Sequence, residues 1–385
     1  MKAVVLAAGE GMRLRPLTRT RPKPMLPIGN QPLLEHVIEA GREAGIDEFV
    51  LVVGYKRERI QSYFGEGDDW DVDIEYAVQE TQLGTGHALL QAESYIDGSF
   101  IALNGDRIIE PSAITAVIQE RRETGSPVMA VTRHRSPENY GVVDIDGQRV
   151  RSIEEKPPAH TVRTDYINAG VYGLGGAIFD EIRRTNADGE LAITTVLQAY
   201  RDSLRPVRFD GLWLDVSYHW DILAVNNRML DRTDSPRAET ASIHERATVV
   251  DVAAVASDVR IRPGATVLPG TSLGENVEVG SNAVLSNCVV LADATVGDGA
   301  VVRDCVIGEN AIIGPNATIE GGDTDVVVDG VVHSDVRLGG VIGDNTTISG
   351  NVTVSPGTVI GNDATVESGS IVSDWIEYNA IVRRG

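Results

Sequence analysis

The stretch IRPGATVLPGTSLGENVEVGSNAVL, residues 261–285, decides how the second half of this 385-residue chain folds. Aliphatic residues recur in it every six positions, at Ile261, Val267, Leu273, Val279 and Leu285. Gly and Asn recur between these positions. An amphipathic helix would need a period of 3.6 residues and fewer glycines. The six-residue period predicts a parallel β-helix, in which each inward aliphatic residue stacks on its equivalent in the next coil.

The repeat extends in both directions from this stretch. It begins at Ile243, reaches Leu291, slips in phase at Val296 and Val302, and runs again from Ile307 to Ile319 and from Ile342 to Val372. Cys288 and Cys305 share one phase of the repeat, so we expect both to be buried, reduced and inert.

The first 231 residues alternate short apolar runs with amphipathic stretches. We expect strands at 4–8, 49–53, 100–104 and 128–132, and helices at 33–45 and 113–125. This alternation predicts an α/β domain with a Rossmann-like, mixed but mostly parallel sheet covered by helices, and with ligands at the carboxyl ends of its strands. The expected organisation is an α/β domain at 1–231, a polar linker at 232–241 and the β-helix, expected to be left-handed, at 242–385.

The charge of the chain limits its partners. A net charge of −22 argues against nucleic acid, no stretch is long and apolar enough to span a membrane, and the N-terminus lacks a signal-peptide cleavage site, so we expect a cytoplasmic protein. An acidic chain with only four lysines suggests adaptation to high salt, with compositional drift as the alternative. The remaining lysines are Lys2, Lys23, Lys56 and Lys156.

Residues 6–27, LAAGEGMRLRPLTRTRPKPMLP, carry the first chemical motif. A strand leads into a Gly9-x-Gly11 turn, whose backbone N–H groups can face a phosphate. Leu14 stands where a dinucleotide fingerprint needs its third glycine, and the Gly-Lys-Ser/Thr of a Walker loop is absent. Arg13 and Lys23 beside such a turn suit a triphosphate, whereas a solvated basic loop is the structural alternative.

This segment resembles the signature of the sugar-1-phosphate nucleotidylyltransferases, G-x-G-x-R-L-x-P-L-T followed by P-K-P-x-x-P. The resemblance implies that Arg13 and Lys23 are catalytic. It also implies that the nucleotide lies against the turn, at Leu6, Ala7, Ala8, Gly9 and Gly11. The spacing from Arg13 to Lys23 is similar to that of glucose-1-phosphate thymidylyltransferases, including archaeal thymidylyl- and uridylyltransferases. The β-helix is more similar to the bifunctional N-acetylglucosamine-1-phosphate uridylyltransferase/glucosamine-1-phosphate acetyltransferases.

The segment VQETQLGTGHALLQA, residues 78–92, resembles the base-recognition segment of the same family. The resemblance makes Gln79, Gly84 and Thr85 the expected contacts to a pyrimidine, because an amide and exposed backbone can bind the imide edge of uracil or thymine. The two bases differ by one methyl group, worth about 1–3 kcal/mol of discrimination, so UTP and dTTP both remain open.

Two aspartates are candidates for binding Mg²⁺. Asp106 ends the buried strand of LNGD (103–106), at the edge of the sheet where ligands bind. Asp215 lies in WLDVSYHWDILAVN (213–226), which resembles the family's W-x-D segment. Either aspartate alone could be a cap or turn residue. Their order in the family pattern favours the metal.

The sugar phosphate has its own candidate residues. NYGVVDIDGQRVRSIEEKPP (139–158) predicts a hairpin, and the resemblance implies that Gly141, Glu155 and Lys156 meet the sugar hydroxyls and phosphate. INAGVY (167–172) resembles the segment that closes over the sugar. It places Asn168 near the 2-substituent of a glucose or N-acetylglucosamine phosphate.

The resemblance implies in-line attack of a hexose 1-phosphate on the α-phosphorus of the triphosphate, with pyrophosphate leaving and the protein supplying position and charge. The alternative is a non-catalytic regulatory subunit, which typically lacks the signature cations or metal carboxylates. The family's β-helices usually pack in threes, so we expect a trimer or a multiple of three.

The repeat breaks at residues 320–340 and resumes at VIGDN (341–345). His333 on this excursion has the spacing to the tetrapeptide that the catalytic base has in the bifunctional acetyltransferases. It could therefore deprotonate a sugar amine that attacks acetyl-coenzyme A. Val336 and Pro356 replace that family's tyrosine and asparagine, and no lysine follows Lys156. A relic loop is the alternative.

Overall fold

The computed structural model describes residues 1–185, 190–232 and 237–384. By their contacts, the residues form two compact units that do not follow chain order. The first comprises Met1–Glu10, Pro22–Met25 and Leu33–Asp215, and the second comprises Gly11–Arg21, Leu26–Pro32 and Val216–Gly385. Part of the signature segment therefore groups with the β-helix. The linker expected at 232–241 includes residues 233–236, which lie outside the described residues.

One sheet organises the first unit. Its strands are β1 (Ala3–Leu6), β4 (Glu48–Val53), β5 (Asp73–Val78), β6 (Ser99–Asn104), β8 (Val128–Arg133), β9 (Gly141–Asp146), β10 (Arg149–Glu155), β11 (Tyr166–Gly175) and β12 (Arg205–Arg208). Seven of them follow the order β10-β9-β11-β6-β1-β4-β5, while β8 pairs with β11 and β12. The central strand β1 is parallel to β4 and β6, and β11 is antiparallel to β6. A separate ribbon joins β7 (Arg107–Ile109) to β13 (Trp213–Asp215).

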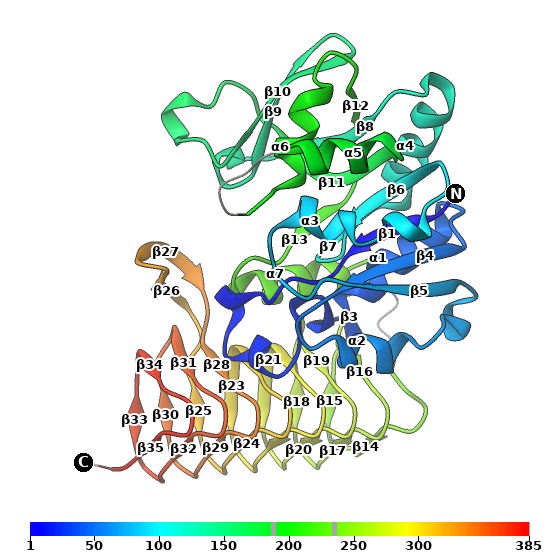
Figure 1. Cartoon of the computed structure of the whole chain (residues 1–385). Coiled ribbons are helices and arrows are strands. Elements are labelled where there is room, and N and C mark those ends of the chain that lie inside the picture. Colours follow the sequence, from blue (N-terminus) through cyan, green and yellow to red (C-terminus); the bar gives the residue numbers. More distant parts are fainter. Residues whose placement is uncertain (186–189, 233–236, 385) are drawn as a thin grey trace. The chain divides into compact units, whose positions relative to one another are not determined.

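Helices cover both faces of this sheet (Figure 1). Strand side chains alternate between the faces, so Val5 packs into one core and Val4 into the other. The first core is covered by α1 (Leu33–Glu43), α2 (Arg57–Phe64) and α4 (Pro111–Thr124). The second is covered by α3 (Thr85–Leu90), α5 (Ala177–Arg184) and α6 (Ile193–Leu197). The predicted α/β architecture and its expected strands and helices are confirmed.

The second unit is a parallel β-helix, as the period predicts. Its coils are built from β14 (Ser242–Ile243), β15 (Thr248–Val249), β16 (Ala254–Val255), β17 (Arg260–Ile261), β18 (Thr266–Val267), β19 (Ser272–Leu273), β20 (Glu278–Val279), β21 (Val284–Val290), β22 (Thr295–Val296), β23 (Val301–Ile307), β24 (Ile312–Ile313), β25 (Thr318–Ile319), β28 (Gly340–Ile342), β29 (Thr347–Ile348), β30 (Thr353–Val354), β31 (Thr358–Ile360), β32 (Thr365–Val366), β33 (Ile371–Val372), β34 (Trp375–Ile376) and β35 (Ile381–Val382). Ile261 pairs with Ile243 and Val279 in neighbouring coils. Corner residues such as Asn276 and Asn310 adopt positive φ, which Asn tolerates better than most residues.

The phase slip occurs one step earlier than expected. Val290, not Leu291, belongs to the interior core, because the inward position after Leu285 comes five positions later instead of six. Cys288 fills the corner between these two inward positions and pairs in register with Cys305 of the next coil. Both cysteines are free and fully buried, as expected.

Three further elements belong to the second unit. They are the ribbon of β2 (Pro27–Ile28) and β3 (Gln31–Pro32), helix α7 (His219–Leu230), and the hairpin of β26 (Asp323–Val328) and β27 (Val331–Arg337). The hairpin projects from the stack of coils at the predicted break in the repeat (Figure 1). None of the helices in the described ranges is long and apolar enough to cross a membrane.

Candidate active site

A cavity of about 490 Å³ opens at the carboxyl ends of β1 and β6, within the first unit. Eleven of the residues expected at the site line it, namely Leu6, Ala8, Gly9, Lys23, Gln79, Gly84, Thr85, Asp106, Glu155, Lys156 and Asn168. Residues to which no motif assigned a role in the site also line it, among them Gln82, Asn104, Arg107, Tyr172 and Glu190. The fold therefore gathers the nucleotide, metal and sugar-phosphate candidates around one space.

Lys23 is the centre of a charged cluster in this cavity. It begins the 3-10 turn Lys23–Met25, and its ammonium lies 2.5 Å from Asp106 Oδ2 and 4.0 Å from Asp215 Oδ1. Arg107 Nε lies 3.6 Å from the same Asp215 oxygen. Asp106 follows β6 and Asp215 ends β13, so two different elements direct their carboxylates at one lysine.

The charges in this cluster stabilise one another. Burial works against the charged form of Asp106, but Lys23 and Arg107 outweigh it and hold the pKa of the carboxyl below its ordinary value. Burial likewise opposes the charge of Lys23, and Asp106 and Asp215 outweigh it and raise the pKa of the ammonium. Both groups are therefore ionised at neutral pH.

The donor set fits Mg²⁺. Asp106 and Asp215 offer the hard carboxylate oxygens that Mg²⁺ prefers, and both approach the point occupied by the Lys23 ammonium. Among the residues that the structure describes, no group of three or more His, Cys, Asp and Glu side chains could hold a metal. Two carboxylates are the number with which proteins commonly hold Mg²⁺ when substrate phosphates and water complete its shell.

Arg107 links the charged cluster to the sugar side of the cavity. Its Nη1 donates to the Asn168 carbonyl at 3.1 Å, and its guanidinium lies 5.2 Å from the Trp213 ring centroid. The Asn168 amide is itself held inside the protein, where Nδ2 donates to Tyr172 Oη at 2.7 Å and Oδ1 accepts from Gly170 N–H at 3.0 Å. The sequence offered one signal for Arg107, its place directly after Asp106, but gave no sign of its burial.

The base-recognition loop is fixed by its own hydrogen bonds. The buried Gln79 amide lies 2.9 Å from His87 Nδ1 and donates to the Gly84 carbonyl at 3.2 Å. Gln82 donates to the Ala8 carbonyl at 2.8 Å, which joins the loop to the end of β1. Gly84 has φ +91°, and a Cβ there would lie 2.5 Å from Leu191 O, so this position needs glycine.

Three first-unit candidates do not line the cavity. Ala7 packs its methyl group into the core, and its N–H is bound to Val52 O at 2.9 Å. Gly141 starts β9, where a Cβ would lie 2.9 Å from Glu155 Oε2. Asp215 does not line the cavity itself, but it contacts Lys23, which does. A side chain at position 141 would therefore displace the Glu155 carboxylate.

Gly11, Arg13 and His333 belong to the second unit. Arg13 Nε lies 3.0 Å from Asp329 Oδ2, at the tip of the β26–β27 hairpin, and its guanidinium lies 5.7 Å from the Tyr218 ring centroid. The His333 ring centroid lies 4.6 Å from that of Tyr218 and 5.2 Å from that of Trp220. His333 therefore packs the hairpin against the aromatic rings of Tyr218 and Trp220. Its role as an acetyl-transfer base stays a prediction.

A polar cavity at the carboxyl ends of parallel strands, in a sheet covered by helices, is where α/β folds of this class bind their ligands. Residues 2–232 match the nucleotidyl transferase family, and residues 249–340 match the GMPPB C-terminal domain. The first match covers more than half of the chain, so the chain belongs to the nucleotidyl transferase family.

Individual relatives agree with this assignment. Residues of the chain are 38% identical over 237 positions to the bifunctional protein GlmU of Methanococcus maripaludis, covering 60% of this chain and 55% of that protein. The low-salt glycan biosynthesis nucleotidyltransferase Agl11 of Haloferax volcanii is 34% identical, and the match covers 68% of this chain and 72% of that protein. The glucose-1-phosphate thymidylyltransferase of Streptomyces griseus is 32% identical, and the match covers 68% of this chain and 75% of that protein. The chain thus spans about half the length of the Methanococcus relative.

The fold also agrees with a solved structure. A crystal structure of a Bacillus anthracis chain, described as a glucose-1-phosphate thymidylyltransferase in complex with a sucrose, is similar with a TM-score of 0.55 and 26% identity. The similarity covers 59% of this chain and 94% of that chain.

Proposed function

We propose that this chain is a sugar-1-phosphate nucleotidyltransferase, which makes a nucleoside diphosphate sugar and pyrophosphate from a pyrimidine triphosphate and a hexose 1-phosphate. The observation that carries the proposal is the cavity of the first unit. Lys23 and Asp106 line the same space as the base-recognition loop and Lys156. A non-catalytic subunit would have no need for this set of charges together.

The base is proposed to be uracil or thymine. The Gln79 amide nitrogen is directed at Gly84 O and His87 Nδ1, which orients the amide oxygen as an acceptor for the imide N–H of a pyrimidine. The triphosphate would follow from the base towards Gly9 and Lys23 at the end of β1. The relative named as a glucose-1-phosphate thymidylyltransferase supports dTTP, and the resemblance of the β-helix to that of the bifunctional uridylyltransferases keeps UTP as a candidate.

The protein would supply position and charge. A phosphate oxygen of the sugar phosphate attacks the α-phosphorus in line, and the bond to pyrophosphate breaks. Lys156 holds the attacking phosphate, and Lys23 stabilises the charge that develops on the triphosphate. Asp106 and Asp215 would hold Mg²⁺, which supplies charge neutralisation on the phosphates. Arg13 is proposed to contribute a second cation to the triphosphate.

A substrate matrix tests the proposal. Purified protein with Mg²⁺ is given UTP or dTTP and either glucose 1-phosphate or N-acetylglucosamine 1-phosphate, and pyrophosphate release is measured for each pair. We expect release that depends on both substrates and on Mg²⁺ with at least one pair. If no pair releases pyrophosphate above the rate without sugar phosphate, the proposal is wrong.

A further inference from the structure

The signature segment leaves the first unit between two residues that line its cavity. Gly9 and Lys23 belong to the first unit, whereas Gly11–Arg21 belongs to the second. The segment carries Arg13 near its start, and Arg21 at its end is separated from Lys23 only by Pro22. Whatever holds the segment in the second unit therefore acts on a stretch of chain that is covalently continuous with the cavity at both ends.

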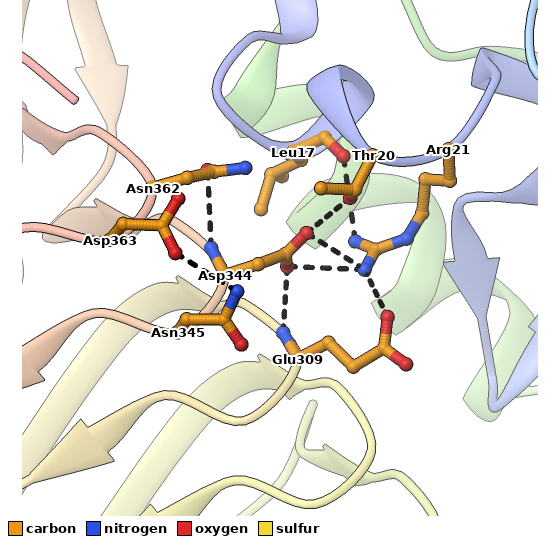
Figure 2. A network of polar contacts seen from close by, with 8 residues as sticks. All are labelled: Leu17, Thr20, Arg21, Glu309, Asp344, Asn345, Asn362 and Asp363. Carbon is orange, nitrogen blue, oxygen red and sulfur yellow. Dashed lines mark hydrogen bonds and ion pairs between the residues drawn. The ribbon is translucent and has the colours of Figure 1, made fainter. Parts of the chain in front are cut away.

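Arg21 is the one buried arginine of the segment, since Arg13, Arg15 and Arg19 are exposed. Its side chain is 5% exposed, and Nη2 lies 2.7 Å from Glu309 Oε2 and 3.0 Å from Asp344 Oδ2. Nη2 also lies 3.1 Å from Asp344 Oδ1. Figure 2 shows both acidic residues, which come from successive coils of the β-helix, meeting this one guanidinium.

Asp344 is built into the coil that presents it. Its side chain is 3% exposed. Oδ1 accepts the Glu309 N–H at 2.8 Å, and the Asp344 N–H donates to Asn362 Oδ1 at 3.2 Å. The Thr20 hydroxyl also donates to this carboxylate (Figure 2). Asp344 is thus held by the coils on both sides of it, through its carboxylate and its backbone N–H, and the carboxylate binds two adjacent residues of the segment.

A buried ion pair fixes geometry better than a surface pair does. An exposed pair is screened by water and salt, whereas removal of one partner from a buried pair leaves an uncompensated charge. Pro22 has a restricted φ, so little slack separates the fixed guanidinium from Lys23. Two further contacts hold the segment, from His219 Nε2 to the Arg15 carbonyl at 2.8 Å and between Arg13 and Asp329.

We propose that Asp344, together with Glu309, is a positioning residue for nucleotidyl transfer. The pair fixes Arg21, and through it the segment that carries Arg13 and continues into Lys23. This proposal rests on the nucleotidyltransferase function proposed above. It assigns the β-helix a part in that reaction, separate from oligomerisation and from acetyl transfer.

The chain offers a matched control for the test. Asp298 in VGDG (296–299) occupies the position in its six-residue repeat that Asp344 occupies in IGDN (342–345), but it follows a strand on another side of the coil. Its Oδ1 accepts the Ser281 N–H at 2.6 Å, as Asp344 Oδ1 accepts that of Glu309. Within the described ranges, no hydrogen bond or ion pair joins Asp298 to the signature segment. Asp344→Asn and Asp298→Asn therefore make the same chemical change, but only the first removes the charge that faces Arg21.

Steady-state kinetics of the full chain are measured well below the melting temperature of each variant. We expect Asp344→Asn to lower kcat by on the order of 10²-fold, the scale reached when reacting groups are misplaced by about 1 Å. The KM for the sugar phosphate should change little, because Lys156 is not on the segment. Glu309→Gln should give a smaller loss, and Asp298→Asn should retain the wild-type kcat. Glu309→Gln also carries the test if Asp344→Asn does not fold.

Two results separate failure of this inference from failure of the proposed function. If the wild type releases pyrophosphate and folded Asp344→Asn matches Asp298→Asn in kcat, the positioning role is overturned. If the wild type releases no pyrophosphate with any substrate pair, the proposed nucleotidyltransferase function is wrong, and the positioning role is wrong as well. Amide hydrogen exchange provides a check independent of activity. Faster exchange over residues 11–21 in Asp344→Asn, but not in Asp298→Asn, is expected, and unchanged exchange would contradict the proposal.

Discussion

The Lys23 ammonium lies near the carboxylates of both Asp106 and Asp215, and this arrangement explains why several charged side chains are tolerated in a buried cluster. Lys23, Asp106, Arg107 and Asp215 alternate in sign, so each offsets the burial of its neighbour. The resemblance of the sequence motifs to those of the family predicted that Lys23 and the two aspartates belong to the site. Arg107 escaped prediction because its burial depends on the pairing of β7 with β13, which no local pattern reveals.

Asp106→Asn should lower kcat by about 10²-fold or more, because the substitution removes one of two carboxylates proposed to hold Mg²⁺ and leaves the volume nearly unchanged. The measurement is pyrophosphate release at saturating Mg²⁺. Asp144→Asn, on half-exposed Asp144 of β9, serves as the control and should keep wild-type turnover. Turnover of Asp106→Asn within a few-fold of wild type would remove the metal assignment.

Lys156→Ala should raise the KM for the sugar phosphate by at least about tenfold, since the loss of a charge-assisted contact costs about 1.5–3 kcal/mol. The KM for the triphosphate should stay within about twofold, well below a tenfold step of 1.4 kcal/mol. Lys56→Ala is a close control, because Lys56 and Lys156 are both lysines at positive φ, 51° and 44°. A loss confined to triphosphate affinity would mean that Lys156 has another role.

At the scale of elements, helix α7 holds the signature segment through its first residue. The His219 ring is buried, and its Nε2 contacts the Arg15 carbonyl. Burial lowers the pKa of His219 to about 4 from an ordinary value of 6.5. A neutral imidazole can donate this hydrogen bond without placing a charge in the interior.

This depressed pKa predicts a pH-dependent stability. The unfolded chain binds a proton at His219 below pH 6.5, and the folded chain does so only near pH 4. The contribution is therefore complete above pH 6.5 and is lost as the pH falls through about 4, to a total of about 3 kcal/mol. Urea unfolding of His219→Gln between pH 7 and 4 should show a flatter dependence than wild type or His244→Gln, which alters an exposed histidine. Equal slopes in all three proteins would contradict it.

The elements were predictable to different degrees. The six-residue period located the coils of the β-helix and the excursion at residues 320–340, because an inward position tolerates little but an aliphatic side chain. The same pattern misplaced the phase slip, since Val290 and Leu291 are adjacent aliphatic residues and only the shortened side of the coil decides which points inward. The contacts of the excursion with Arg13, Tyr218 and Trp220 join residues distant in sequence, so no local pattern could reveal them.

At the scale of the whole molecule, the two compact units are built from alternating stretches of the chain and not from two consecutive halves. The sequence predicted two domains in succession, but Gly11–Arg21 and Leu26–Pro32 group with the β-helix. Buried Asn226 of α7 shows how this is achieved, since its Oδ1 accepts from Gly29 N–H and Ser272 Oγ. Motif spacing carries no information about such contacts, which depend on how α7 packs against the coils.

We expect the chain to form trimers, or multiples of three, through its β-helix. Ile312 and Ile381, in β24 and β35 of one β-sheet ladder, are 45% and 63% exposed, and apolar surface of this kind is a candidate for burial between subunits. Light scattering should give three times the 41.3 kDa of one chain, or a multiple. The measurement is made in high and low salt, because a net charge of −22 would drive subunits apart at low ionic strength. A monomer in both conditions would exclude the trimer.

The fate of the individual phosphates tests the central claim most directly. Wild-type protein with Mg²⁺ and a hexose 1-phosphate is given UTP or dTTP labelled at either the α- or the γ-phosphate, and the products are separated. Transfer of a nucleotidyl group predicts the α label in a nucleoside diphosphate sugar and the γ label in pyrophosphate. Recovery of the γ label as inorganic phosphate, with the α label in the nucleoside diphosphate and none in a sugar nucleotide, would contradict the account.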